Sequence, residues 1–281
     1  MLTDYHVHLR PDRDDTSAER YFTRENAERY REVAGERGIE ELGVAEHVHR
    51  FVQALDVWTH PWYRHWATDD LDAYCEFIRE ETDLRLGIEM DFLPGREDRV
   101  ANLLDGRPWD YVVGSIHFLR EDMVDVHHEE SRWADVSVWR GVDPEKVWAR
   151  YFEMLGEAAR TGLFDILAHP DLVKVFGDRV PTPERDPRRY YERAMDGIAE
   201  SDVAIEVSTA GLRKPVGEIY PAAAFLELSL EAGRPVALSS DAHTPDQLGH
   251  EYERAVDWLR ELGVDELAVF EHRERRLEPL G

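Results

Sequence analysis

The chain has almost no cysteine and very little lysine. Cys75 is the single cysteine among 281 residues, so neither an internal disulfide nor a site built from several thiolates can form. Lysine occurs only at Lys146, Lys174 and Lys214. Positive charge is scarce as a whole, because 34 basic residues face 60 acidic ones and give a formal net charge of −26. Since nucleic-acid backbones are bound through clustered positive charge, this balance argues against a nucleic-acid partner.

Long apolar runs are also missing. No run approaches the roughly 20 residues that span a membrane, and the first residues lack the basic start and apolar core of a signal peptide. We therefore expect a cytoplasmic protein without a membrane partner. Apolar residues make up 42% of the chain, which is enough for a sizeable core. Nothing in the sequence specifies an oligomeric state.

Short apolar stretches alternate with amphipathic ones along the whole chain. We expect strands at 4–8, 42–45, 84–88, 111–114, 165–168, 203–207, 236–238 and 267–270, and helices at 16–38, 71–81, 96–104, 144–161, 186–201, 222–232 and 251–262. An aromatic loop at 51–68 and an acidic, histidine-bearing segment at 122–135 interrupt the pattern. Strands and helices that alternate with short links are typical of parallel βα units. The sequence therefore predicts a single α/β domain over residues 1–281, most simply a barrel.

The first predicted strand ends in two histidines. His6 and His8 are two positions apart, so on a strand their side chains point to the same face. Arg10 and Pro11 then end the strand and leave both histidines at its carboxyl end, where α/β folds place their chemistry. Two neighbouring imidazoles can share a metal ion, although the pair alone is also compatible with two exposed histidines that have no role.

Histidines and acids recur at the other strand ends. All carboxyl ends of a parallel barrel open on one face, so we expect that face to gather His6, His8, Glu46, His47, Glu89, His117, His169, Asp241 and His243. These nine include six of the thirteen histidines, which chance placement on the surface does not readily explain.

Nine nitrogen and oxygen ligands exceed the four to six positions around one ion. We therefore expect two or three divalent ions, and zinc, iron(II) or manganese suits this ligand set. A carboxylate such as Glu89 can bridge two ions that lie about 3.5 to 4 Å apart, as in two-metal hydrolases.

The order of these motifs resembles the PHP (polymerase and histidinol phosphatase) superfamily, and above all its histidinol-phosphate phosphatase branch. The segments that carry the resemblance are Asp4-Tyr5-His6-Val7-His8, Glu46-His47, Gly87-Ile88-Glu89, Gly114-Ser115-Ile116-His117, Ala168-His169-Pro170-Asp171 and Ser240-Asp241-Ala242-His243. They span essentially the whole chain, and their combination is specific, whereas any one of them is weak. The resemblance implies a distorted (β/α)7 barrel whose two- or three-metal centre hydrolyses phosphate esters.

The resemblance also implies which residues share an ion. The first ion would bind His6, His8, Glu89 and Asp241, the second Glu89, His117 and His169, and a third His47 and His243, with or without Glu46. The chain departs from the family at the third site. Glu46 stands where many members have aspartate, and Asp12, Asp14 and Asp15 stand where many have a further histidine. Either a carboxylate replaces that histidine or the third ion binds weakly.

Two basic residues resemble substrate contacts of the phosphatase branch. Arg213 lies in the loop that follows a predicted strand, and its planar guanidinium can pair two phosphate oxygens at once. The alternative in so acidic a protein is a surface arginine paired with an acid. Lys174, five residues after His169, resembles a second basic contact, and Ser208 stands where related sequences often have asparagine.

We therefore expect a metal-dependent phosphomonoesterase, with L-histidinol phosphate of histidine biosynthesis as its substrate. A hydroxide that bridges two ions would attack phosphorus directly, with Glu89, Asp241, His243 and Arg213 as catalytic residues. The aromatic loop could cover the imidazole of the substrate, and the acidic surplus could pair with its ammonium. The alternatives are a phosphoesterase of the same superfamily with another small ester as substrate, a nuclease, or a metal-stabilised module with closed coordination and no catalysis.

Overall fold

The computed structural model describes residues 1–127, 133 and 136–281, so part of the irregular segment expected at 122–135 lies outside the described residues. Seven parallel strands form one sheet, in the order β1 (Thr3–Asp4), β2 (Glu41–His47), β3 (Arg85–Asp91), β4 (Tyr111–Ser115), β7 (Ile166–Leu167), β8 (Ala204–Ser208) and β9 (Val236–Ser239). Beyond β1 and β9, the amide of His8 donates to the carbonyl of Ala242 at 2.8 Å. The sheet is thus a nearly closed barrel, and the predicted (β/α)7 fold class is confirmed.

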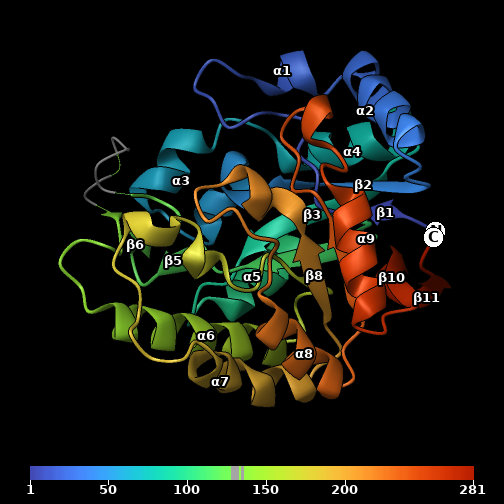
Figure 1. Ribbon diagram of the computed structural model, residues 1–281. Helices are drawn as coiled ribbons and strands as arrows, with labels where there is room; N and C mark the ends of the chain where they lie inside the picture. Colours follow the sequence, from blue (N-terminus) through green and yellow to red (C-terminus); the bar gives the residue numbers. More distant parts are fainter. Residues whose placement is uncertain (128–132, 134–135) are drawn as a thin grey trace.

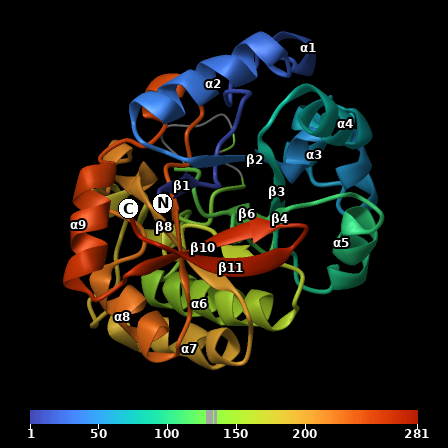
Figure 2. The ribbon, with the colours of Figure 1, turned by 90° about the vertical axis from the view of Figure 1, so that its right-hand side faces the viewer.

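Helices surround the barrel (Figures 1 and 2). They are α1 (Ala18–Tyr21), α2 (Arg24–Glu36), α3 (Pro61–Trp66), α4 (Leu71–Glu81), α5 (Glu97–Leu104), α6 (Pro144–Arg160), α7 (Arg188–Ala199), α8 (Ala223–Glu231) and α9 (Tyr252–Glu261). Short 3₁₀ helices add η1 (Val48–Arg50), η2 (Val52–Asp56), η4 (Leu172–Lys174), η5 (Gly177–Arg179), η6 (Thr209–Arg213) and η7 (Pro245–Gln247), and β5 (Phe118–Leu119) pairs with β6 (Asp122–Met123). Among the helices that the structure describes, none is long and apolar enough to cross a membrane.

Several predicted segments differ from the structure. The helix expected at 16–38 is divided, because Thr23 has an extended backbone and its side chain accepts the amide of Asn26 at 3.2 Å, which caps α2. The loop expected at 51–68 contains η2 and α3. Pro61 occupies the first turn of α3, and the side chain of His60 accepts the amide of Trp62 at 3.2 Å.

The last predicted strand lies outside the barrel sheet. It is β10 (Glu266–Glu271), which pairs antiparallel with β11 (Glu274–Pro279), a strand that the sequence analysis did not predict. Figure 2 shows this hairpin across one end of the barrel, and the amide of Arg273 donates to the carbonyl of Asp110, directly before β4. Phe270 packs edge-on against Tyr5, with ring centroids 5.7 Å apart. The hairpin therefore closes the amino end of the barrel.

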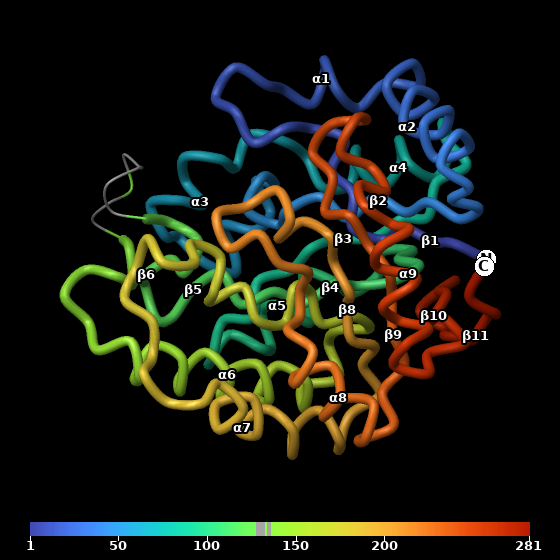
Figure 3. Tube along the Cα trace, in the orientation of Figure 1, coloured from blue at the N-terminus to red at the C-terminus, as the bar shows by residue number. Residues whose placement is uncertain are grey.

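The barrel interior near the hairpin is filled by aromatic side chains. Tyr111 takes the space over Gly43 and Gly87, where a Cβ atom on either glycine would clash with its ring. The two chain ends meet on the same side, since the amino group of Met1 donates to the carbonyl of Pro279 at 2.6 Å (Figure 3). Because the amino end of the barrel is filled in this way, its carboxyl end is the end at which a site of the barrel can form.

Candidate metal centre

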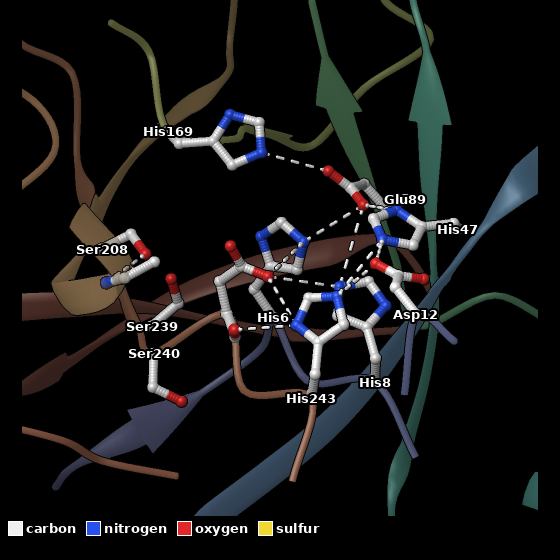
Figure 4. A network of polar contacts seen from close by, with 12 residues as sticks. His6, His8, Asp12, His47, Glu89, His169, Ser208, Ser239, Ser240 and His243 are labelled. Atoms are coloured by element: carbon white, nitrogen blue, oxygen red, sulfur yellow. Dashed lines mark hydrogen bonds and ion pairs between the residues drawn. The ribbon is translucent and has the colours of Figure 1, made fainter. Parts of the chain in front are cut away.

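The carboxyl ends of the strands converge on one polar cluster (Figure 4). The cluster holds eight of the nine predicted ligands: His6, His8, His47, Glu89, His117, His169, Asp241 and His243. His6, His8 and Glu89 are at most 2% exposed, whereas His47 and His243 are partly exposed. The cluster therefore has a buried floor and a more open side.

His6 and His8 lie beside Asp241. Oδ1 of Asp241 is 3.9 Å from Nε2 of His6 and 3.4 Å from Nε2 of His8. The histidines follow β1 and the aspartate follows β9, so the closure of the barrel brings them together. Atoms that bind one zinc ion at about 2.0 to 2.2 Å lie roughly 3 to 3.6 Å from one another. These three side chains are therefore close to the spacing of ligands that share an ion.

Glu89, in β3, presents Oε1 to one pair of histidines and Oε2 to a second pair, and Oε2 also pairs with Nδ1 of His47. Its Oε2 is 3.4 Å from Nε2 of His6 and 3.8 Å from Nε2 of His8. Its Oε1 is 3.4 Å from Nε2 of His117 and 3.2 Å from Nε2 of His169. One carboxylate thus connects two ligand groups, as a glutamate that bridges two ions does.

Asp12 joins His47 and His243 in a third group. Oδ2 of Asp12 is 3.2 Å from Nε2 of His47 and 2.9 Å from Nε2 of His243, and the two nitrogens are 3.4 Å apart. Asp14, another of the three aspartates at this place in the sequence, lies 3.1 Å from Nε2 of His65 instead. Asp12 is therefore a carboxylate in position to replace the further histidine of the family.

Several atoms of the cluster lack a hydrogen-bond partner. Among the described residues, Nε2 of His6 and both ring nitrogens of His8 are buried without one, which costs about 1 to 3 kcal/mol for each atom unless another group binds it. Burial opposes charge on Glu89, but His47, His6 and His117 hold the pKa of its carboxyl well below its ordinary range. Imidazoles around an ionised carboxylate fit divalent zinc, iron or manganese.

Two carboxylates that the sequence analysis did not select contact the Nδ1 atoms of candidate ligand histidines. Oε1 of Glu206, in β8, lies 2.7 Å from Nδ1 of His6, and Oδ1 of Asp91, in β3, lies 2.7 Å from Nδ1 of His117. If each carboxylate accepts the Nδ1 proton, Nε2 is free to face the centre. Glu206 could have been found from sequence, because a charge inside an otherwise apolar strand needs a buried partner.

Glu46 lies near His8, on the side of its Nδ1 atom. Its Oε1 accepts the amide of Arg10 at 3.1 Å, and its Oε2 is 3.3 Å from Nη1 of Arg50 and 3.9 Å from Nδ1 of His8. Arg50 is fully buried and also pairs with Asp12. Arg50 thus ties Glu46 to Asp12, and a ligand role for Glu46 itself stays a prediction.

Two predicted ligands have left-handed backbone conformations. The φ angle is 25° at His169 and 49° at Asp241. Such angles cost about 1 kcal/mol or more in residues other than glycine, so the surroundings must enforce them. The amide of His169 donates to Glu206, and the carbonyl of Asp241 accepts from Arg213 at 2.9 Å. These contacts hold both residues at the centre.

Arg213 lies beside the centre, at the end of η6. Its Nη2 donates to the carbonyls of Ser240 at 2.8 Å and Asp241 at 2.9 Å, whereas its buried Nη1 has no hydrogen-bond partner in the described part of the chain. The guanidinium is thus anchored through one nitrogen and keeps donor capacity for an anion.

Lys174 is buried and already has three acceptors. Its ammonium lies 2.9 Å from Asp171 and 3.0 Å from Glu218, and it donates to the carbonyl of Ile219 at 3.2 Å. The predicted contact with substrate would require one acceptor to move away. Glu218 is the one most able to do so, because its side chain is 61% exposed.

Aromatic side chains from the segment 51–68 cover the side of the centre next to His47. The ring of His49 stacks on His47 with centroids 4.8 Å apart, and Trp62 and Trp66 lie 5.6 and 6.4 Å from His49. These tryptophans reach the candidate ligand His47 only through His49, and a cover over the substrate stays a prediction.

Comparisons with known proteins agree with this arrangement. A family model described as PHP domain matches residues 22–210. The chain is 38% identical over 205 residues to a Deinococcus radiodurans protein named "probable histidinol-phosphatase". This match covers 73% of this chain and 74% of the relative. It is 26% identical over 185 residues to a Bacillus subtilis histidinol-phosphatase, and this match covers 62% of this chain and 69% of the relative.

A solved structure shares the fold along nearly the whole chain. It is the histidinol phosphate phosphatase of Lactococcus lactis complexed with zinc, L-histidinol and phosphate. The TM-score is 0.69 at 16% sequence identity, and the match covers 98% of both chains.

Proposed function

Because this chain belongs to the PHP domain family, we propose that it is a metal-dependent phosphomonoesterase that converts L-histidinol phosphate and water into L-histidinol and phosphate. The substrate is inferred from the relatives of Deinococcus radiodurans and Bacillus subtilis, which are named as histidinol-phosphatases. This reaction would place the enzyme in histidine biosynthesis. The cytoplasmic location and the lack of a nucleic-acid partner stay predictions from composition.

The position of Glu89 carries the proposal. Its two oxygens face two separate histidine pairs within 3.8 Å. A centre that served structure alone would need one closed set of ligands. A shared carboxylate between two groups, with an unpaired arginine nitrogen beside them, instead supports a hydrolytic centre with room for an anion.

Three groups of side chains would hold the ions. They are His6, His8, Glu89 and Asp241 for the first ion, Glu89, His117 and His169 for the second, and Asp12, His47 and His243 for the third. Divalent ions bound there supply Lewis acidity, which lowers the pKa of water and neutralises negative charge on phosphate. Zinc is supported by the Lactococcus lactis complex, and iron(II) or manganese suits the same donors.

The protein's own residues bind and orient the phosphate. Arg213 offers its unpaired Nη1 to a phosphate oxygen, while the carbonyls of Ser240 and Asp241 hold the guanidinium in place. A donor that is fixed before the reaction stabilises charge in the transition state without a cost of reorganisation. Asp241 and His243 adjoin this position, since Nδ1 of His243 is 3.6 Å from Oδ1 of Asp241.

Release of inorganic phosphate from L-histidinol phosphate tests the proposal. The full-length protein is loaded in turn with zinc, manganese or iron(II), and a chelator-treated sample is the control. We expect turnover with at least one ion and none after chelation. A protein that binds the ions but releases no phosphate would exclude the proposed activity.

A further inference from the structure

A cavity of about 330 Å³ opens beside the third ligand group. Its lining includes Asp12 and His243 together with the basic residues Arg13, Arg213 and Lys214. The volume is at the lower end of the range for small-molecule sites. The cavity therefore gives a small molecule a place next to the candidate metal ligands.

The positive charge in this cavity is not cancelled within the described residues. Lys214 is exposed and has no ion pair there. Arg13 pairs with Asp15 at 3.7 Å, but both side chains are more than 60% exposed, and such pairs contribute little. Glu218, the acid in the same loop as Lys214, is paired with Lys174.

The one acid among the lining residues is already engaged. Asp12 pairs with Arg50 and lies 2.9 Å from Nε2 of His243. The cavity is thus locally positive in a protein whose formal net charge is −26. A dianionic phosphate would be repelled by the acidic surface as a whole, so a positive entrance has a large effect on its capture.

We propose that Arg13 and Lys214 form a phosphate-capture site, which draws the phosphate group into the cavity and passes it to Arg213. The inference rests on the proposed function for the identity of the ester, but the chemistry it needs is that of phosphate alone. Inorganic phosphate, the product, should bind at the same place. Arg13 and Lys214 therefore act on binding, and Arg213 acts on the reacting group.

Binding of inorganic phosphate to the metal-loaded protein tests this site. Arg13→Gln, Lys214→Gln and the double variant are compared with Lys146→Gln, which removes the same charge from the exposed face of α6. We expect each single variant to lower the affinity for inorganic phosphate about three- to tenfold at low salt, and the double variant to lower it further. The effect should shrink at about 0.5 M NaCl, where charges are screened beyond roughly 4 Å.

Kinetics with L-histidinol phosphate give the second measurement. The same variants should lower kcat/KM mainly through KM, while metal content stays that of the wild type. Phosphate affinity within twofold of wild type in the double variant would overturn the inference, as would an equal loss in Lys146→Gln. If phosphate binding weakens as expected but no variant or wild-type protein hydrolyses the ester, the capture site stands and the proposed function fails.

Discussion

Oε1 of Glu206 lies 2.7 Å from Nδ1 of His6, although 200 positions separate the two residues in the chain. Both side chains are about 1% exposed. The same glutamate accepts the hydroxyl of Ser239 at 2.7 Å and the amide of His169. Glu206 therefore orients His6 and His169, which belong to two different candidate ion sites.

Glu206→Gln should weaken metal binding. The amide keeps the shape of the side chain but loses the charge that makes His6 a better ligand, and such changes typically cost about 10- to 100-fold in metal affinity. Zinc titration against a competing chelator measures this. Glu227→Gln, at an exposed position of α8, is the control. A zinc affinity equal to that of the wild type in Glu206→Gln would show that the contact between Glu206 and His6 does not strengthen metal binding.

Glu89→Gln should lose metal and most activity together. The substitution removes the charge shared by two ligand groups, so both ions lose a ligand. Metal analysis of the purified variant is the measurement. Full metal occupancy would count against a bridging role for Glu89.

Arg213→Ala should keep its metal and lose activity. Arg213 is held by backbone carbonyls and does not belong to any of the three ligand groups. Removal of one charged donor to the transition state lowers kcat/KM by about 10- to 1,000-fold. Arg213→Lys should recover part of the loss, because it restores charge but not the planar fork. An unchanged kcat/KM in Arg213→Ala would contradict the assignment of Arg213 as a phosphate contact.

Asp12→Ala should remove one ion and leave the other two. Among the candidate ligands that the structure describes, Asp12 pairs with His47 and His243, and Arg50 holds it there. The metal content of wild type and variant, counted per chain, is the measurement. Equal metal content in the two proteins would mean that Asp12 is not a ligand.

The sequence predicted which ligands meet where their positions follow from the ends of the strands. Parallel strands end on one face, so Glu89 at the end of β3 and His169 after β7 could be placed together without a structure. The charge of Glu206 inside an apolar strand indicates a buried partner, but no spacing in the sequence identifies His6, across the barrel, as that partner.

The same limit explains the errors in the fold. β1 has only two residues, and its continuation past Asp4 depends on bonds to Ala242, near the other end of the chain. β11 has an exposed, charged pattern that indicates no strand, and its pairing with β10 specifies it. Asp12 could be named as one of three candidates, but only the fold selects it over Asp14.

The preference of the enzyme between two esters tests the central claim most directly. In the proposed function, the metals, Arg213 and the basic cavity would recognise the phosphate that every monoester carries, so selectivity would have to come from groups around the rest of the substrate. The aromatic side chains Trp62 and Trp66 pack near His49, the neighbour of His47, and would supply the cover for an imidazole. The acidic surplus of the chain, with 60 acidic residues against 34 basic ones, would supply a partner for the ammonium.

Two such contacts, each worth about 1 to 3 kcal/mol, predict a preference on the order of 100-fold or more for L-histidinol phosphate over p-nitrophenyl phosphate. The measurement is kcat/KM for both esters under one metal condition. A ratio of 100 or more is the predicted result. Values within a few-fold of each other would contradict the assignment of histidinol phosphate as the substrate.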